Sequence, residues 1–144
     1  MVIFILQDQR YIKPMKDILV PISPGELLDK ITILQIKTER MSDPGKVANV
    51  KIELNALTDV WKNSVAEDDT VKQLHRDLKM INEALWDIED DIRDEERARN
   101  FGEKFIELAR SVYVTNDQRA EAKKKLNIHL GSTLVEEKSY QDYQ

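Results

Sequence analysis

A regular apolar pattern that starts at Val71 constrains this chain more than any other feature. Apolar residues recur at alternating intervals of three and four, which places them on one face of an α-helix: Val71, Leu74, Leu78, Ile81, Leu85, Ile88 and Ile92. A helix from Thr70 to about Arg97 is about 42 Å long at 1.5 Å per residue, whereas a domain of this size has a radius of gyration of about 14–15 Å. The pattern therefore predicts an elongated antiparallel helical bundle around one long central helix.

The composition agrees with an all-α fold. Of the 144 residues, 41% are apolar and 34% are charged, which excludes a disordered tail. Four Gly and four Pro are too few for a turn-rich all-β fold. The length suits one domain with its own core. We therefore expect a single helical domain over residues 15–144.

Charge and composition also exclude several classes of protein. The net charge of −5 argues against electrostatic binding of nucleic acid. The chain has no cysteine, which excludes disulfides, thiolate metal sites and a cysteine nucleophile. The apolar run Val2–Leu6 is too short for a signal peptide or a membrane span. We expect a cytoplasmic protein without membrane insertion.

The N-terminal segment differs from the rest of the chain. Val2–Leu6 and Ile18–Ile22 are rich in β-branched residues and could pair as a short hairpin, although a lone hairpin is marginal in water. Met15-Lys16-Asp17 resembles a natural start. We expect residues 1–14 to be an N-terminal extension.

The first helix has a clear beginning at Ser23-Pro24-Gly25-Glu26. Serine is favoured at the N-cap, proline at the first helical position, and Glu26 can reach back to the serine amide. The apolar residues that follow surround most of the helix: Leu27, Leu28, Ile31, Ile33, Leu34 and Ile36. Such a helix is buried on more than one side, by the core or by another subunit. We expect a homo-oligomer, specifically a dimer.

A second helix follows Ser42-Asp43-Pro44-Gly45. Its apolar residues form a narrow stripe suited to packing on one partner: Val47, Val50, Leu54, Leu57 and Trp61. The polar segment Asn63–Asp69 predicts a short connection, and therefore antiparallel neighbours.

Three helices are expected after the break at Asn100-Phe101-Gly102. The first ends near Val114, where Thr115-Asn116-Asp117 supplies a cap for the next. The second runs to Leu130, with Gly131 as its C-terminal stop. Residues 132–140 are expected to form a short last helix.

An acidic stripe on the long helix is the first candidate site. Asp87, Asp90, Asp91 and Asp94 share one face and repel one another. Mg²⁺ could compensate, because it takes carboxylate oxygens. With Glu26 and Asp29 on the first helix, this arrangement resembles the all-helical nucleotide pyrophosphohydrolases of the MazG kind in residue types, although the spacing of their motif is absent. Alternatively, the stripe is a solvated face that arginines such as Arg93 and Arg110 neutralise.

A second candidate site lies around the expected break near residue 115. Helix N-termini attract anions, and arginine binds phosphate or carboxylate with two parallel hydrogen bonds. The candidate ligand-binding residues are Arg110, Tyr113, Asn116, Arg119 and Lys123. The alternative is an ordinary helix cap whose arginines pair with the acidic stripe.

Several long segments resemble a family of small bacterial proteins that is catalogued only as a domain of unknown function. The segments are ILVPISPGELLDKITIL at residues 18–34, LWDIEDDIR at residues 85–93, FIELARSVY at residues 105–113, and GS followed by EEKSY at residues 131–140. The similarity covers about Met15 to Tyr143. It implies no established activity. Members are often encoded among genes for surface-polysaccharide assembly.

Two functions remain open from the sequence. The first is a non-catalytic helical module that binds itself or a protein partner, associated with surface-glycan assembly and needing no cofactor. The second is a Mg²⁺-dependent enzyme or binding protein for a small anion such as a nucleotide or sugar phosphate. We favour the first, because no catalytic motif is present.

Overall fold

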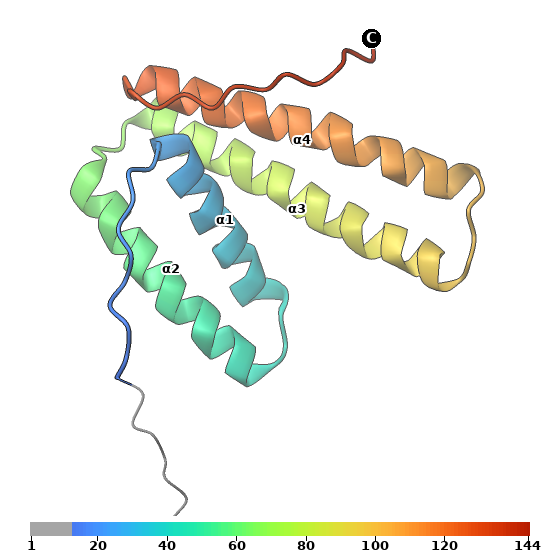
Figure 1. Cartoon of the computed structure of the whole chain (residues 1–144), viewed down its shortest axis with the longest axis horizontal. Coiled ribbons are helices and arrows are strands. Elements are labelled where there is room, and N and C mark those ends of the chain that lie inside the picture. Colours follow the sequence, from blue (N-terminus) through green and yellow to red (C-terminus); the bar gives the residue numbers. More distant parts are fainter. Residues whose placement is uncertain (1–12) are drawn as a thin grey trace, which may run out of the picture.

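The computed structural model describes residues 13–144, which form four α-helices and no strand (Figure 1). The helices are α1 (Pro24–Arg40), α2 (Pro44–Ser64), α3 (Asp69–Arg97) and α4 (Glu103–His129). The predicted all-α bundle is therefore confirmed. Val2–Leu6 lies outside the described residues, and Ile18–Ile22 is extended without forming a strand.

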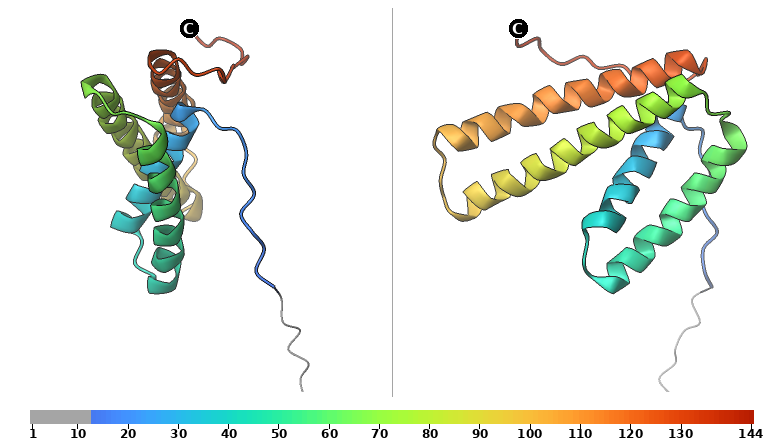
Figure 2. Two further views of the ribbon diagram at one scale, coloured as in Figure 1. Left: turned by 90° about the vertical axis from the view of Figure 1, so that its left-hand side faces the viewer. Right: turned by 180° about the vertical axis from the view of Figure 1, so that it is seen from behind.

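The helices form two antiparallel hairpins that meet at one end and diverge towards the other (Figures 1 and 2). The first hairpin is α1–α2 and the second is α3–α4. α1 contacts all three other helices, whereas α2 packs on α1 alone. The central position thus belongs to the most buried helix, α1, rather than to the longest one, α3. No helix within residues 13–144 has the length and hydropathy needed to cross a membrane.

The core lies at the shared end of the hairpins. It consists mainly of large aliphatic side chains: Leu27, Leu28, Ile31, Trp61, Val71, Leu78, Ala122 and Leu126. The apolar circumference of α1 is therefore covered within one chain, so it gives no reason for a dimer. The dimer stays a prediction. A run of consecutive exposed apolar residues lies in the segment before α1, where Ile18, Leu19 and Val20 are 73%, 90% and 68% exposed.

Several expected helix boundaries are confirmed. The Ser23 hydroxyl accepts a hydrogen bond from the Glu26 amide at 3.2 Å, and Pro24 is the first residue of α1. Asp43 caps α2 in the same way, at 3.0 Å from the Lys46 amide. Gly131, with φ of +67°, follows the end of α4 in the left-handed conformation that glycine adopts without strain.

Two expectations about the C-terminal third are wrong. α4 is continuous through Thr115-Asn116-Asp117, where a break was expected. These residues disfavour a helix by only a few tenths of a kcal/mol each, and packing of α4 along α3 and α1 outweighs that cost. Residues 132–144 are not helical. They run back along α4 as an extended segment, which we name the strap (Figure 1).

The pH dependence of stability should reflect His75, which lies between α3 and α1 with its Nε2 3.2 Å from Gln35 Oε1. Burial lowers the pKa of His75 below its ordinary value of 6.5. The unfolded chain therefore gains a proton before the folded chain as pH falls, and the free energy of unfolding decreases below about pH 6.5. In His75→Gln this decrease should be smaller. Urea denaturation at about pH 7.5 and about pH 5.5 measures it; an identical decrease in both proteins would contradict the assignment.

Candidate functional site

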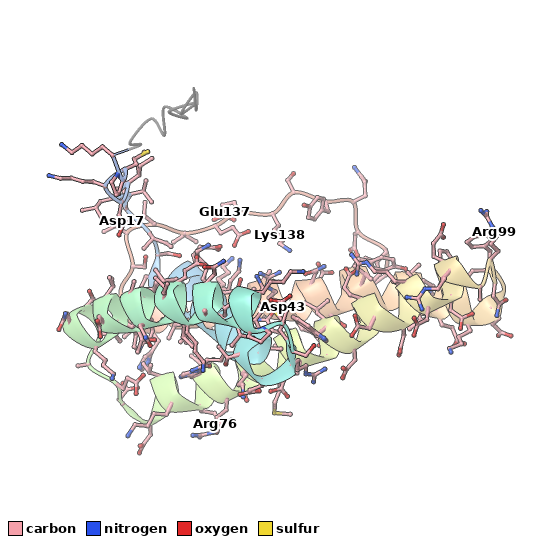
Figure 3. The ribbon with its side chains drawn as sticks, turned by 90° about the horizontal axis from the view of Figure 1, so that it is seen from below. Asp17, Asp43, Arg76, Arg99, Glu137 and Lys138 are labelled. Atoms are coloured by element: carbon pink, nitrogen blue, oxygen red, sulfur yellow. The ribbon has the colours of Figure 1, made fainter. Side chains whose placement is uncertain are left out.

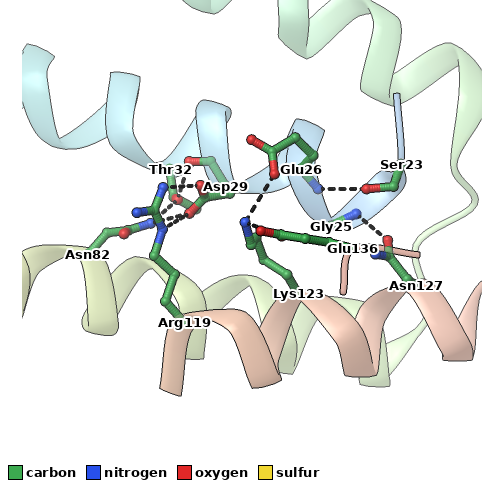
Figure 4. A network of polar contacts seen from close by, with 10 residues as sticks. All are labelled: Ser23, Gly25, Glu26, Asp29, Thr32, Asn82, Arg119, Lys123, Asn127 and Glu136. Carbon is green, nitrogen blue, oxygen red and sulfur yellow. Dashed lines mark hydrogen bonds and ion pairs between the residues drawn. The ribbon is translucent and has the colours of Figure 1, made fainter. Parts of the chain in front are cut away.

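A buried polar cluster joins α1, α3 and α4 (Figure 4). Its centre is Asp29, whose side chain is 1% exposed. Arg119 donates to both carboxylate oxygens, from Nε to Oδ1 at 2.8 Å and from Nη2 to Oδ2. Asn82 Nδ2 donates to Asp29 Oδ1 at 2.9 Å and to the Thr32 hydroxyl at 3.0 Å. The hydrogen bond to Asp29 raises the pKa of the Arg119 guanidinium, so the guanidinium stays charged.

A second ion cluster lies one turn further along α4. The Lys123 ammonium is 3.0 Å from Glu26 Oε2 of α1 and 2.8 Å from Glu136 Oε2 of the strap. Burial alone lowers the pKa of Lys123, but the hydrogen bonds to Glu136 and Glu26 outweigh burial and raise it. Glu26 thus pairs with Lys123 instead of closing the expected capping box. The Glu136 and Glu26 side chains are 47% and 44% exposed, so both carboxylates reach solvent.

The start of α1 approaches α4 closely at Gly25. The Gly25 amide donates to Asn127 Oδ1 at 2.7 Å. A Cβ atom at this position would lie 2.6 Å from the Lys123 carbonyl oxygen and 2.9 Å from Asn127 Oδ1. Only glycine allows these two backbones to come so close. Asp29 and Glu26 are thereby held opposite Arg119 and Lys123.

Four of the five candidate ligand-binding residues gather in one groove between α4 and the strap. The groove has a volume of about 470 Å³ and contains Tyr113, Asn116, Arg119 and Lys123, with Lys138 and Tyr140 contributed by the strap. The fifth candidate, Arg110, does not line it, but its Nε lies 3.4 Å from the Tyr113 hydroxyl. We name this cavity the strap groove. Figure 3 labels Lys138 on the strap beside the helices.

The strap is attached to the helices at three places. Near its start, the Ser132 amide donates to the Asn127 carbonyl at 2.9 Å. In its middle, Glu136 pairs with Lys123. Near its end, the Tyr143 ring packs edge-on against Tyr113, with ring centres 5.0 Å apart. A hydrogen bond with Asp117 raises the pKa of Tyr143.

The acidic stripe is not gathered into a metal site. Asp87 pairs with Arg40 of α1, and Asp94 lies 3.3 Å from Arg97. Within residues 13–144, no group of three or more His, Asp or Glu side chains is placed to hold a metal ion. Arg93 pairs with Glu89, on its own helix, and Arg110 contacts Tyr113. The expected pairing of Arg110 with the stripe is therefore wrong, because α1 supplies the cation instead.

A second cavity lies where the two hairpins diverge, on the other side of Arg119. It has a volume of about 360 Å³ and is lined by three helices: Ile33 of α1, Asn82, Leu85, Trp86, Glu89, Asp90 and Arg93 of α3, and Asn116 and Arg119 of α4. We name it the inter-hairpin pocket. Asp90 is the one residue of the acidic stripe that meets candidate ligand-binding residues, namely Asn116 and Arg119.

Sequence analysis missed the roles of Asn82, Thr32 and Glu136. Asn82 follows Leu78 by four positions and therefore lies on the buried side of α3, where a polar residue indicates a buried partner. Likewise, Arg119, Lys123 and Asn127 repeat every four residues and form one row that faces α1 (Figure 4). No sequence signal indicates that the strap returns to α4, since residues 132–140 were expected to form a short helix instead.

Fold and site together define a small four-helix module with two solvent-reaching cavities on either side of a buried ion cluster. Residues 18–143 match the model of the family of unknown function DUF6165, so the chain belongs to that family. Comparisons with curated proteins and with solved structures gave no match.

The ion pair between Arg119 and Asp29 should matter strongly for stability. Arg119→Ala leaves a buried carboxylate without its cation, so we expect the free energy of unfolding to fall by about 3 kcal/mol. Lys125→Ala, on the same helix, removes an exposed pair with Glu121 at 3.9 Å and should change it by less than about 1 kcal/mol. Urea denaturation compares the two; equal, small losses would show that the buried pair gives no net stability.

Two glycine substitutions test the close approach of α1 to α4. In Gly25→Ala the added methyl overlaps the backbone of α4, and we expect a loss of about 1–3 kcal/mol. Gly45→Ala is the matched control, since its Cβ would lie 3.4 Å from the nearest atom, Asp43 Oδ1. That substitution should be neutral or stabilising by up to about 1 kcal/mol. Thermal unfolding measures both, and a tolerated Gly25→Ala would mean that α1 sits further from α4.

Proposed function

We propose that this protein is a non-catalytic binding module whose strap groove takes a small anionic ligand, a phosphorylated molecule in particular. The observation that supports this most directly is the grouping of Tyr113, Asn116, Arg119 and Lys123 with strap residues around one cavity. Its volume of about 470 Å³ is within the usual range for small-molecule sites.

The charges in and beside the groove favour an anion. Among the described residues, Arg110, Lys124 and Lys138 have no carboxylate partner within ion-pair distance, since none of the ion pairs on α4 includes them. Lys138 lines the groove, and Arg110 lies beside Tyr113. Cations without partners attract phosphate, and arginine can hold it with two hydrogen bonds.

Glu136 occupies the place where we propose that an anionic group binds. It contacts the Lys123 ammonium through a side chain that is half exposed and belongs to a segment without regular structure. A phosphate could replace this carboxylate at Lys123, whereas Glu26 would remain on the other side. The strap carboxylate is thus an internal competitor for the ligand.

The carboxylates of the groove are committed to partners, which favours binding over catalysis. Glu136 pairs with Lys123, and Asp117 faces Tyr143 and raises the pKa of its hydroxyl. Asp29, behind the groove, is bonded to Arg119 and Asn82. A general base needs a carboxylate that can reach the substrate. The link to surface-glycan assembly stays a prediction, and it makes sugar phosphates and sugar nucleotides the first ligands to test.

We expect glucose 1-phosphate, uridine monophosphate or pyrophosphate to raise the melting temperature, because a ligand of the native state stabilises it. Glu136→Gln removes the competing charge and should tighten binding by about fivefold, equivalent to about 1 kcal/mol. Lys138→Ala should weaken binding by a similar factor, whereas Lys125→Ala, outside the groove, should not change it.

Calorimetric titration with and without Mg²⁺ gives the affinities and separates the alternatives. Equal affinity in Glu136→Gln, Lys138→Ala and the parent protein would place any binding elsewhere. Release of inorganic phosphate in the presence of Mg²⁺ would contradict the non-catalytic role and support the Mg²⁺-dependent alternative.

A further inference from the structure

We infer that the inter-hairpin pocket is a second binding site, and that it takes a flat, uncharged nitrogen heterocycle with an exocyclic amine, of the kind found in nucleobases. This pocket is separate from the strap groove, and the inference goes beyond the proposed function. It rests on three observations. Side chains from three helices meet in the pocket, several of its polar groups make no hydrogen bond to protein in the described part of the chain, and its remaining charge is negative.

The walls of the pocket come from three helices that the buried ion cluster fixes relative to one another. α1 contributes Ile33, α3 contributes Asn82, Trp86 and Asp90, and α4 contributes Asn116. Side chains on packed helices are held more precisely than side chains on loops. The cavity of about 360 Å³ can therefore keep its shape without a ligand.

The hydrogen bonds of Asn82 determine which of its atoms remains available. The residue is buried, with 5% of its surface exposed. The Asp29 carboxylate can only accept, so the amide nitrogen must face it, and the same nitrogen also donates to Thr32. The carbonyl oxygen of Asn82 is then the atom left for the pocket. Within the described residues it has no donor.

Other polar groups of the pocket are also unused. Among residues 13–144, the side chains of Trp86 and Asn116 make no hydrogen bond to protein; the other tryptophan, Trp61, donates to Glu67 at 2.7 Å. The ion pairs of the acidic stripe do not include Asp90. The pocket thus offers a flat indole surface, two acceptors in Asn82 and Asp90, and one amide that can donate and accept.

The charge of the pocket argues against an anion. Arg119 is neutralised by Asp29 and Arg93 by Glu89, so Asp90 carries the remaining charge. An indole stacks on flat rings, and carboxylate or amide oxygens accept from amino groups. A nucleobase with an exocyclic amine meets both requirements, whereas a phosphate does not.

The experiment is a titration of ¹⁵N-labelled protein with adenosine, observed through the two tryptophan indole signals. The Trp86 signal should shift, and the Trp61 signal, from a buried and bonded indole, should stay in place as an internal control of folding. Trp86→Phe assigns the signals. Inosine, which carries a carbonyl where adenosine carries the amine, should bind about tenfold more weakly, the loss expected for one good hydrogen bond.

A matched pair of variants tests the acceptor. Asp90→Asn should weaken adenosine binding by about tenfold, and Asp91→Asn, on the neighbouring exposed position outside the pocket, should leave it unchanged. Three results would overturn the inference: an unmoved Trp86 signal, equal affinity for inosine, or a Trp86 shift with methyl glucoside but not with adenosine. Because adenosine has no phosphate, its result does not depend on whether the strap groove binds anions.

Discussion

The arrangement of the molecule depends on the contact between the first turns of α1 and the second half of α4. Apolar packing places α1 among the other helices but does not by itself fix its rotation or its height along α4. The bidentate Asp29–Arg119 pair does so, because two parallel hydrogen bonds tolerate little displacement. Gly25 permits the short distance at which that pair, and the Glu26–Lys123 pair beside it, can form.

The same contact separates the two cavities. Arg119 and Asn116 line both cavities, so this part of α4 separates the strap groove from the inter-hairpin pocket. On one side the strap supplies accessible cations and tyrosines. On the other, α3 supplies an indole and uncommitted oxygens. The strap groove contains Lys138, a cation without a carboxylate partner among the described residues. In the inter-hairpin pocket Asp29 neutralises Arg119, and Asp90 carries the remaining charge. The two proposed ligands therefore differ in charge.

Much of the fold could be predicted from periodicity, because apolar spacing and caps are local properties. Ser23, Asp43 and Gly131 mark helix ends through short-range hydrogen bonds and backbone conformation. The grouping of Tyr113, Asn116 and Lys123 in one groove was also within reach, since their spacing places them on one helical face. What sequence alone could not supply was the partner of each charge. Arg40, rather than Arg110, reaches the acidic stripe because α1 ends beside α3.

Because the two hairpins differ in length, apolar side chains are fully buried in one part of the molecule and only partly buried in the other. Near the shared end, Leu28, Val71 and Leu126 are at most 1% exposed. Beyond the end of α1, the α3–α4 hairpin has no third layer, and Ile88, Ile92 and Leu108 are only half-buried (Figure 2). Amide hydrogens in this tip should therefore exchange with solvent through local opening, whereas those of the shared end exchange only when the whole domain unfolds. The inter-hairpin pocket lies at the boundary, so a ligand there would extend the slowly exchanging region towards the tip.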